Sequence, residues 1–260
     1  MPGRNAGQRI KAVLDRVDSV SPSVNLVEGF KQLFAYAPKD AEREHARRME
    51  ALLLQLDLAE AQLRKDKFPE VLFRRQFGKR REGFRPALMH QPFAHARGNL
   101  DEAARLCIDW VGFALPDEGE ALDPSEAQML ANQLEELLAS PLLADLPSSV
   151  RDLLAVHLRA VLEAIAMADI EGAAPLQKAA KAAATDLVIH ADEIDACARS
   201  ASDGQSTFLK RCGSALKHAM EAASLGGKGA EGVEKMLKLA TERGPRALEL
   251  AKDVMNQLTS

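Results

Sequence analysis

Apolar residues recur at every third or fourth position along most of this chain, and this spacing is typical of one face of an α-helix. The clearest stripe lies within residues 39–67 and consists of Met49, Leu52, Leu56, Ala59 and Leu63. Its alternating steps of three and four residues match the seam of two heptads. Leu53, Leu54 and Leu58 widen the stripe, so the pattern favours burial in a helical bundle over a two-stranded coiled coil.

Proline, glycine and capping residues divide the rest of the chain into further helical segments. Asp123, Pro124 and Glu126 form a sharp helix start, and Gly172 suits the position just after a helix end. The predicted helices cover residues 5–20, 23–37, 39–67, 100–114, 123–139, 148–170, 175–190, 192–200, 207–225, 231–243 and 246–258. We therefore predict an all-α fold without a sheet, either a multi-helix bundle or an irregular helical array of about nine to eleven helices.

The length of 260 residues suits one large domain or two small ones. We predict an N-terminal helical part, residues 1–115, which holds the long helix 39–67 and a basic segment at 64–85. An alanine- and leucine-rich helical part, residues 116–260, follows, and the two parts form either separate domains or one continuous domain.

Charge is also divided along the chain. The net charge is +7 in residues 1–100, −12 in 101–172 and +1 in 173–260, which gives the overall value of −4. This balance excludes a chain that is basic throughout, and the apolar content of 47% excludes a disordered one. The opposed blocks are suited to docking between proteins.

The basic segment is the part of the sequence that most favours a binding function. It carries nine basic side chains, three acidic ones and four phenylalanines. Such a cluster would neutralise phosphates, and its aromatic rings would offer stacking platforms for unpaired bases. The residues that we predict to bind a polyanion or a partner are Arg64, Lys65, Lys67, Arg74, Arg75, Lys79, Arg80, Arg81, Arg85, Phe73, Phe77 and Phe84.

Two structural interpretations of the same segment compete with binding. Phe68, Phe73 and Phe77 fit the anchoring of a short helix in the core, with the arginines solvated outside. Alternatively, the segment docks on the acidic stretch 101–172, within the chain or in a partner.

No residue is nominated as catalytic, cofactor-binding or metal-binding, and we expect no cofactor. The glycines at 226–229 lack the spacing of a phosphate loop, and no HExxH or nucleophile motif occurs. His157 lies within an apolar stripe and is expected to be a core histidine. The acidic residues after His190 are expected to form a helix N-terminus, with Asp192 as its cap. The three cysteines are scattered, and we expect buried thiols.

Residues 123–176 combine a leucine-spaced helix, a break at 140–143, a second helix and an exit at 170–172. In these features the segment resembles uncharacterised bacterial all-helical proteins that are often encoded near phage-defence or mobile-element genes. The resemblance covers about a fifth of the chain. It implies a helical fold in a bacterial defence or stress context, and no functional residue is carried across from it.

These observations together favour a non-enzymatic helical interaction or regulatory protein that associates with itself or with a protein partner. The first alternative is a nucleic-acid-binding protein that uses residues 64–85, and the second is a helical toxin or effector whose site is not recognised. No stretch is long and apolar enough to span a bilayer, and membrane-surface contact is not expected. We therefore expect a cytoplasmic protein.

Overall fold

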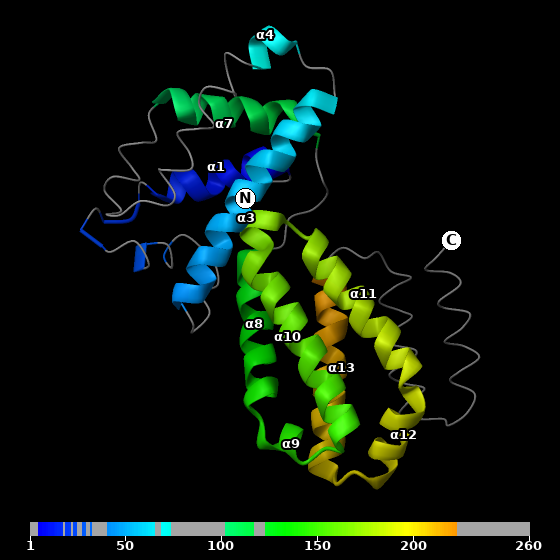
Figure 1. Cartoon of the computed structure of the whole chain (residues 1–260). Helices are drawn as coiled ribbons and strands as arrows, with labels where there is room; N and C mark the ends of the chain where they lie inside the picture. Colours follow the sequence, from blue (N-terminus) through cyan, green and yellow to red (C-terminus); the bar gives the residue numbers. More distant parts are fainter. Residues whose placement is uncertain are drawn as a thin grey trace. The chain divides into compact units, whose positions relative to one another are not determined.

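The computed structural model describes residues 5–17, 19–21, 23–24, 28–29, 32, 41–65, 69–73, 102–116 and 123–222, except for the side chains of 17, 41–46, 72, 73 and 104. All regular secondary structure in these residues is helical, which confirms the predicted all-α fold (Figure 1). The predicted helices at 23–37, 231–243 and 246–258 lie wholly or largely outside the described residues.

The chain divides into two compact units. Unit 1 comprises Met1–Pro124 together with Ala166–Ala173, and unit 2 comprises Ser125–Ile165 together with Ala174–Ser260. The helices of unit 1 are α1 (Ala6–Val17), α3 (Ala41–Lys65), α4 (Glu70–Phe73) and α7 (Glu102–Ala114). Those of unit 2 are α8 (Pro124–Ala139), α9 (Pro141–Ala144), α11 (Ala174–Ile189), α12 (Ala191–Ser200) and α13 (Asp203–Ala222). Helix α10 (Ser148–Glu171) begins in unit 2, and its last turns belong to unit 1.

In unit 1, α1 packs against both α3 and α7. All five residues of the predicted stripe on α3 are buried, none being more than 3% exposed. The predicted widening of this stripe is wrong for Leu54 and Leu58, which are 50% and 51% exposed. With 3.6 residues per turn, these two leucines lie on the side of α3 opposite the buried stripe.

The contact between α1 and α7 is unusually close because glycines meet there. A Cβ atom added at Gly7 would lie 2.4 Å from the backbone nitrogen of Gly112, so neither helix could carry a larger residue at this point without moving. Asn5 fixes the same crossing. As the helix cap, its Oδ1 accepts a hydrogen bond from the backbone N–H of Gln8. Its Nδ2 donates to the carbonyls of Gly112 and Leu115 at 3.0 Å.

Three arginines of unit 1 hold the carboxyl end of α10. The buried Arg9 donates through Nε to the Ile170 carbonyl at 2.9 Å, and the buried Arg48 donates to the Ala166 carbonyl at 3.0 Å. Arg16 pairs with Asp169 at 3.3 Å. Cations at a helix carboxyl end interact favourably with the helix dipole, so these contacts stabilise the last turns of α10 within unit 1.

Helix α10 ends where the sequence predicts. Gly172 adopts a φ of +74°, which is the left-handed conformation that favours glycine after a helix end. An added Cβ at this position would lie 2.9 Å from a terminal guanidinium nitrogen of Arg9, so the Arg9 side chain would have to shift.

Unit 2 is built on leucine-rich and alanine-rich contacts. Leu130, Leu134 and Leu137 of α8 are buried as the spacing predicts. Helix α11 packs on α13, and the small residues Gly213, Ala215 and Ala219 of α13 are buried.

Candidate partner-binding pocket

Most of the predicted binding residues lie outside the part of the chain that the structure describes. These are Lys67, Arg74, Arg75, Lys79, Arg80, Arg81, Arg85, Phe77 and Phe84. Phe73 is the last residue of α4, and its side chain is not described. The binding role of the segment therefore stays a prediction.

The two basic residues that are described, Arg64 and Lys65, are exposed at the end of α3. Arg64 pairs with Glu60 at 3.1 Å, as the i,i+4 spacing predicts, and lies 3.6 Å from Glu70. Its charge is thus balanced by carboxylates of its own chain.

The three cysteines of the chain all lie in the described residues. Cys107, Cys197 and Cys212 are all buried, as predicted, and burial raises the pKa of the Cys212 thiol to about 12. No group of three or more possible metal ligands is found in the ranges that the structure describes.

His157 is buried on α10, as predicted, with its Nε2 lying 3.1 Å from an Asp186 carboxylate oxygen on α11. Burial lowers the pKa of His157, and the neighbouring Asp186 raises it in part.

Helix α12 begins after His190, where the sequence predicts a helix N-terminus. The N-cap residue is His190 itself, whereas the predicted cap, Asp192, lies inside the first turn. Glu193 of that turn accepts from Ser149, and this bond lowers the pKa of Glu193.

A pocket that the sequence does not indicate lies in unit 2 where α8, α9 and α10 meet. The break at Ser140 and Pro141 ends α8 and starts the single turn of α9, because proline suits the first position of a helix. At the other end of α9, the Asp145 amide donates back to the Pro141 carbonyl, and its own carbonyl accepts from Gln205 Nε2 at 3.1 Å. The turn between α9 and α10 is therefore fixed to α13.

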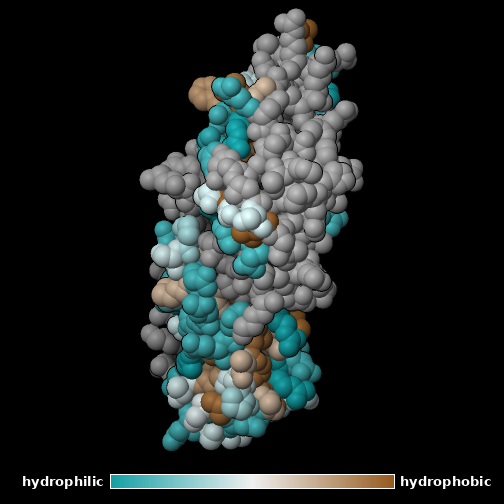
Figure 2. Space-filling model, turned by 90° about the vertical axis from the view of Figure 1, so that its left-hand side faces the viewer, coloured by the Kyte–Doolittle hydropathy of each residue, from teal (hydrophilic) through white to brown (hydrophobic). Residues whose placement is uncertain are grey.

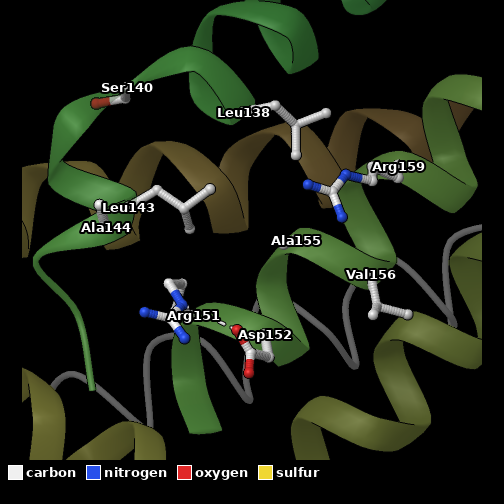
Figure 3. Close-up of a pocket in the computed structure, with 9 residues that line it drawn as sticks. All are labelled: Leu138, Ser140, Leu143, Ala144, Arg151, Asp152, Ala155, Val156 and Arg159. Carbon is white, nitrogen blue, oxygen red and sulfur yellow. Dashed lines mark hydrogen bonds and ion pairs between the residues drawn. The ribbon is translucent and has the colours of Figure 1, made fainter. Parts of the chain in front are cut away.

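The pocket has a volume of about 390 Å³. It is lined by Leu138, Ser140, Leu143, Ala144, Arg151, Asp152, Ala155, Val156 and Arg159 (Figure 3). Leu143 and Ala155 are buried and form its apolar floor, while Val156 is 58% exposed. Figure 3 shows Leu138 and Leu143 pointing into the space between the helices, and Leu138 is half-buried.

The two arginines of the pocket lie on opposite sides of this floor (Figure 3). Arg151 donates through Nε to Asp152 at 2.9 Å, and this hydrogen bond raises the pKa of Arg151. Arg159 is exposed and makes no hydrogen bond or ion pair with any residue in the described ranges. The pocket therefore carries two cations and one carboxylate around an apolar floor.

The exposed surface of the helices α8 to α13 also combines apolar and hydrophilic residues. In the lower part of Figure 2, apolar residues form a strip between hydrophilic ones. Met129 of α8 and Val156 of α10 are more than half exposed. The pocket is open, whereas pockets for small molecules enclose most of their ligand.

Sequence patterns alone do not reveal this pocket. Arg151, Ala155 and Arg159 follow one another at i, i+4 and i+8 on α10, so they share one side of that helix. The sequence shows an alanine between two arginines on one side of α10. It does not show that α9 packs opposite them and completes the pocket. Comparison of the chain with protein-family models, with curated proteins and with solved structures finds no match.

Proposed function

We propose that this chain is a non-enzymatic helical interaction protein that associates through the pocket formed by α8, α9 and α10. The proposal is carried by an open pocket with an apolar lining, in which Val156 is 58% exposed, and by Arg159 at its side, a guanidinium that no described residue of the chain engages. Apolar surface that stays exposed beside charged groups marks interaction sites more often than single scattered residues do.

The surroundings of the pocket support binding more than chemistry. Its lining contains no histidine, cysteine or glutamate, and its one carboxylate, Asp152, pairs with the adjacent Arg151. The buried His157 lies against Asp186. Among the described helices none is long and apolar enough to cross a lipid bilayer.

Self-association is the first form of this function to test. Light scattering of the purified chain across the micromolar range is expected to show a mass that rises with concentration. Val156→Glu and Arg159→Glu are expected to lower the association, while Lys178→Glu, which changes an exposed cation of α11, leaves it unchanged. A strictly monomeric chain at every concentration would remove self-association from the proposal.

We also propose a defence or stress context for this function, because residues 123–176 resemble bacterial proteins that are often encoded near phage-defence or mobile-element genes. It is an additional proposal, and a test of phage plating on cells with and without the gene addresses it directly. Equal plating on both would count against that context, and it would leave the binding role of the pocket as proposed.

A further inference from the structure

The residues of α10 that line the pocket include three at regular steps along the helix. Arg151, Ala155 and Arg159 are spaced by four residues, so about 12 Å of helix separates the two arginines, with the alanine midway. Because Ala155 has only a methyl group, the surface sinks between the two longer side chains. Leu138 and Leu143 face this depression from α8 and α9 (Figure 3).

The two arginines differ in how far their charges are free to bind a further anion. Arg151 shares its charge with Asp152, whereas the guanidinium of Arg159 has no partner among the described residues. A carboxylate that approached Arg159 would meet an uncompensated cation with a planar pair of donors. A carboxylate that approached Arg151 would also meet the repulsion of Asp152.

From this arrangement we infer that the pocket binds an acidic amphipathic helix of a protein partner, in which a bulky apolar residue lies midway between two carboxylates eight positions apart. The apolar side chain fills the depression over Ala155, and the two carboxylates lie against Arg151 and Arg159. The pattern is symmetric, so the charges accept the partner helix in either direction. This inference rests on the proposed binding role of the pocket, but it does not require the partner to be a second copy.

The openness of the pocket favours a helix over a small amphiphile. Val156 on its wall is 58% exposed, so a small ligand seated there would keep much of its surface in water. A partner helix inserts one side chain and buries the remainder of its contact on the surrounding surface of α8 and α10. Recognition through one helix anchored by an apolar residue is a common mode of peptide binding.

The test uses a fluorescein-labelled helical peptide that carries Glu, Leu and Glu at positions i, i+4 and i+8, titrated with the full chain by fluorescence anisotropy. Two control peptides replace both Glu residues by Gln or by Lys. We expect saturable binding of the Glu peptide that weakens when salt is raised, and binding at least about tenfold weaker for the Gln and Lys peptides.

Variants of the chain locate the contacts. Arg159→Glu is expected to weaken binding of the Glu peptide at least about tenfold, and more than Arg151→Glu does. Ala155→Phe fills the depression and is expected to abolish binding, while Asp152→Asn removes the competing carboxylate and is expected to tighten it. Lys178→Glu on α11 is the matched charge control and should bind as the unchanged chain does. Far-ultraviolet circular dichroism checks that each variant remains folded.

Equal affinity for the Glu and Gln peptides, preference for the Lys peptide, or no binding of the Glu peptide would each overturn the inference. So would an Arg159→Glu variant that binds as the unchanged chain does. The proposed function has a separate outcome. Concentration-dependent association that Val156→Glu lowers would still support the pocket as a binding site, even where the acidic peptide fails.

Discussion

The buried guanidinium of Arg9 in α1 donates through Nε to the carbonyl of Ile170 in the last turn of α10, at 2.9 Å and across 161 positions of the chain. A terminal nitrogen of the same group donates to the Gln55 amide oxygen of α3 at 3.0 Å. One side chain thereby joins α1, α3 and the last turn of α10 within unit 1. Since a buried cation is costly without hydrogen-bond partners, these contacts determine whether Arg9 stabilises or weakens the fold.

Replacement of Arg9 by methionine keeps much of its volume and removes the donors. The Ile170 carbonyl and the Gln55 amide oxygen then lose a buried partner, so we expect the free energy of unfolding to fall by about 2–4 kcal/mol. Urea denaturation followed by circular dichroism measures the change. Arg64→Met removes an exposed arginine paired with Glu60 and should cost no more than about 0.5 kcal/mol. Equal losses for both variants would show that the Arg9 contacts do not matter.

The close crossing of α1 and α7 gives a second prediction. Gly7→Ala places a Cβ 2.4 Å from the Gly112 nitrogen, and because both atoms belong to backbone the helices must separate. We expect a loss of about 3 kcal/mol in the free energy of unfolding. Gly204→Ala is the matched control, since its Cβ would have nothing nearer than 3.8 Å and would gain up to about 0.8 kcal/mol of helix propensity. A neutral Gly7→Ala would contradict the observed packing.

Asn5 tests the cap at that same crossing. Asn5→Ala removes the acceptor for the Gln8 amide and both donors to the carbonyls of Gly112 and Leu115, and we expect a loss of about 2–3 kcal/mol in thermal or urea unfolding. Asn5→Asp keeps an acceptor for Gln8 but directs a carboxylate at the two carbonyls. It should therefore be destabilising too, whereas a role for Asn5 as helix cap alone predicts a stable Asp variant.

The His157 and Asp186 pair predicts a dependence of stability on pH. Burial lowers the pKa of His157 below its ordinary value of 6.5 in the folded chain. The unfolded chain thus binds the proton more readily, and the stability contributed above 6.5 is lost as the pH falls through the folded value. We expect His157→Leu to reduce this loss of unfolding free energy between pH 7 and pH 5. Asp186→Asn removes the carboxylate that raises the pKa of His157, so it should make the loss larger. An unchanged slope in both variants would contradict the assignment.

The helices and much of the core are predictable from this sequence because they depend on local spacing. The α3 stripe from Met49 to Leu63 is buried as its heptad steps indicate. Gly172 ends α10 because the backbone there needs a positive φ, a requirement that follows from residue type alone. The sequence does not show that Leu54 is exposed, because burial of an apolar residue opposite the stripe depends on which helices pack there.

The polar contacts between distant segments are not predictable in this way. Nothing local distinguishes the buried Arg9 and Arg48 from the exposed Arg64, since all three occupy helices rich in charge. Arg9 and Arg48 differ from Arg64 because they donate to carbonyls in the last turns of α10, which are distant in the sequence and come together with α1 and α3 only in the folded unit 1. The pocket is hidden for the same reason, because Leu143 and Ala155 meet only after the chain turns at Asp145.

The central claim, that the pocket between α8, α9 and α10 is a binding site for an acidic helix, is tested most directly by methyl NMR. The labelled chain is titrated with the Glu–Leu–Glu peptide, and the methyl signals of Leu143, Ala155 and Val156 are followed. We predict saturable shifts of these signals, with those of the exposed Leu54 of unit 1 unchanged. Shifts at Leu54 without shifts at the three pocket residues, or no shifts at all, would contradict the account.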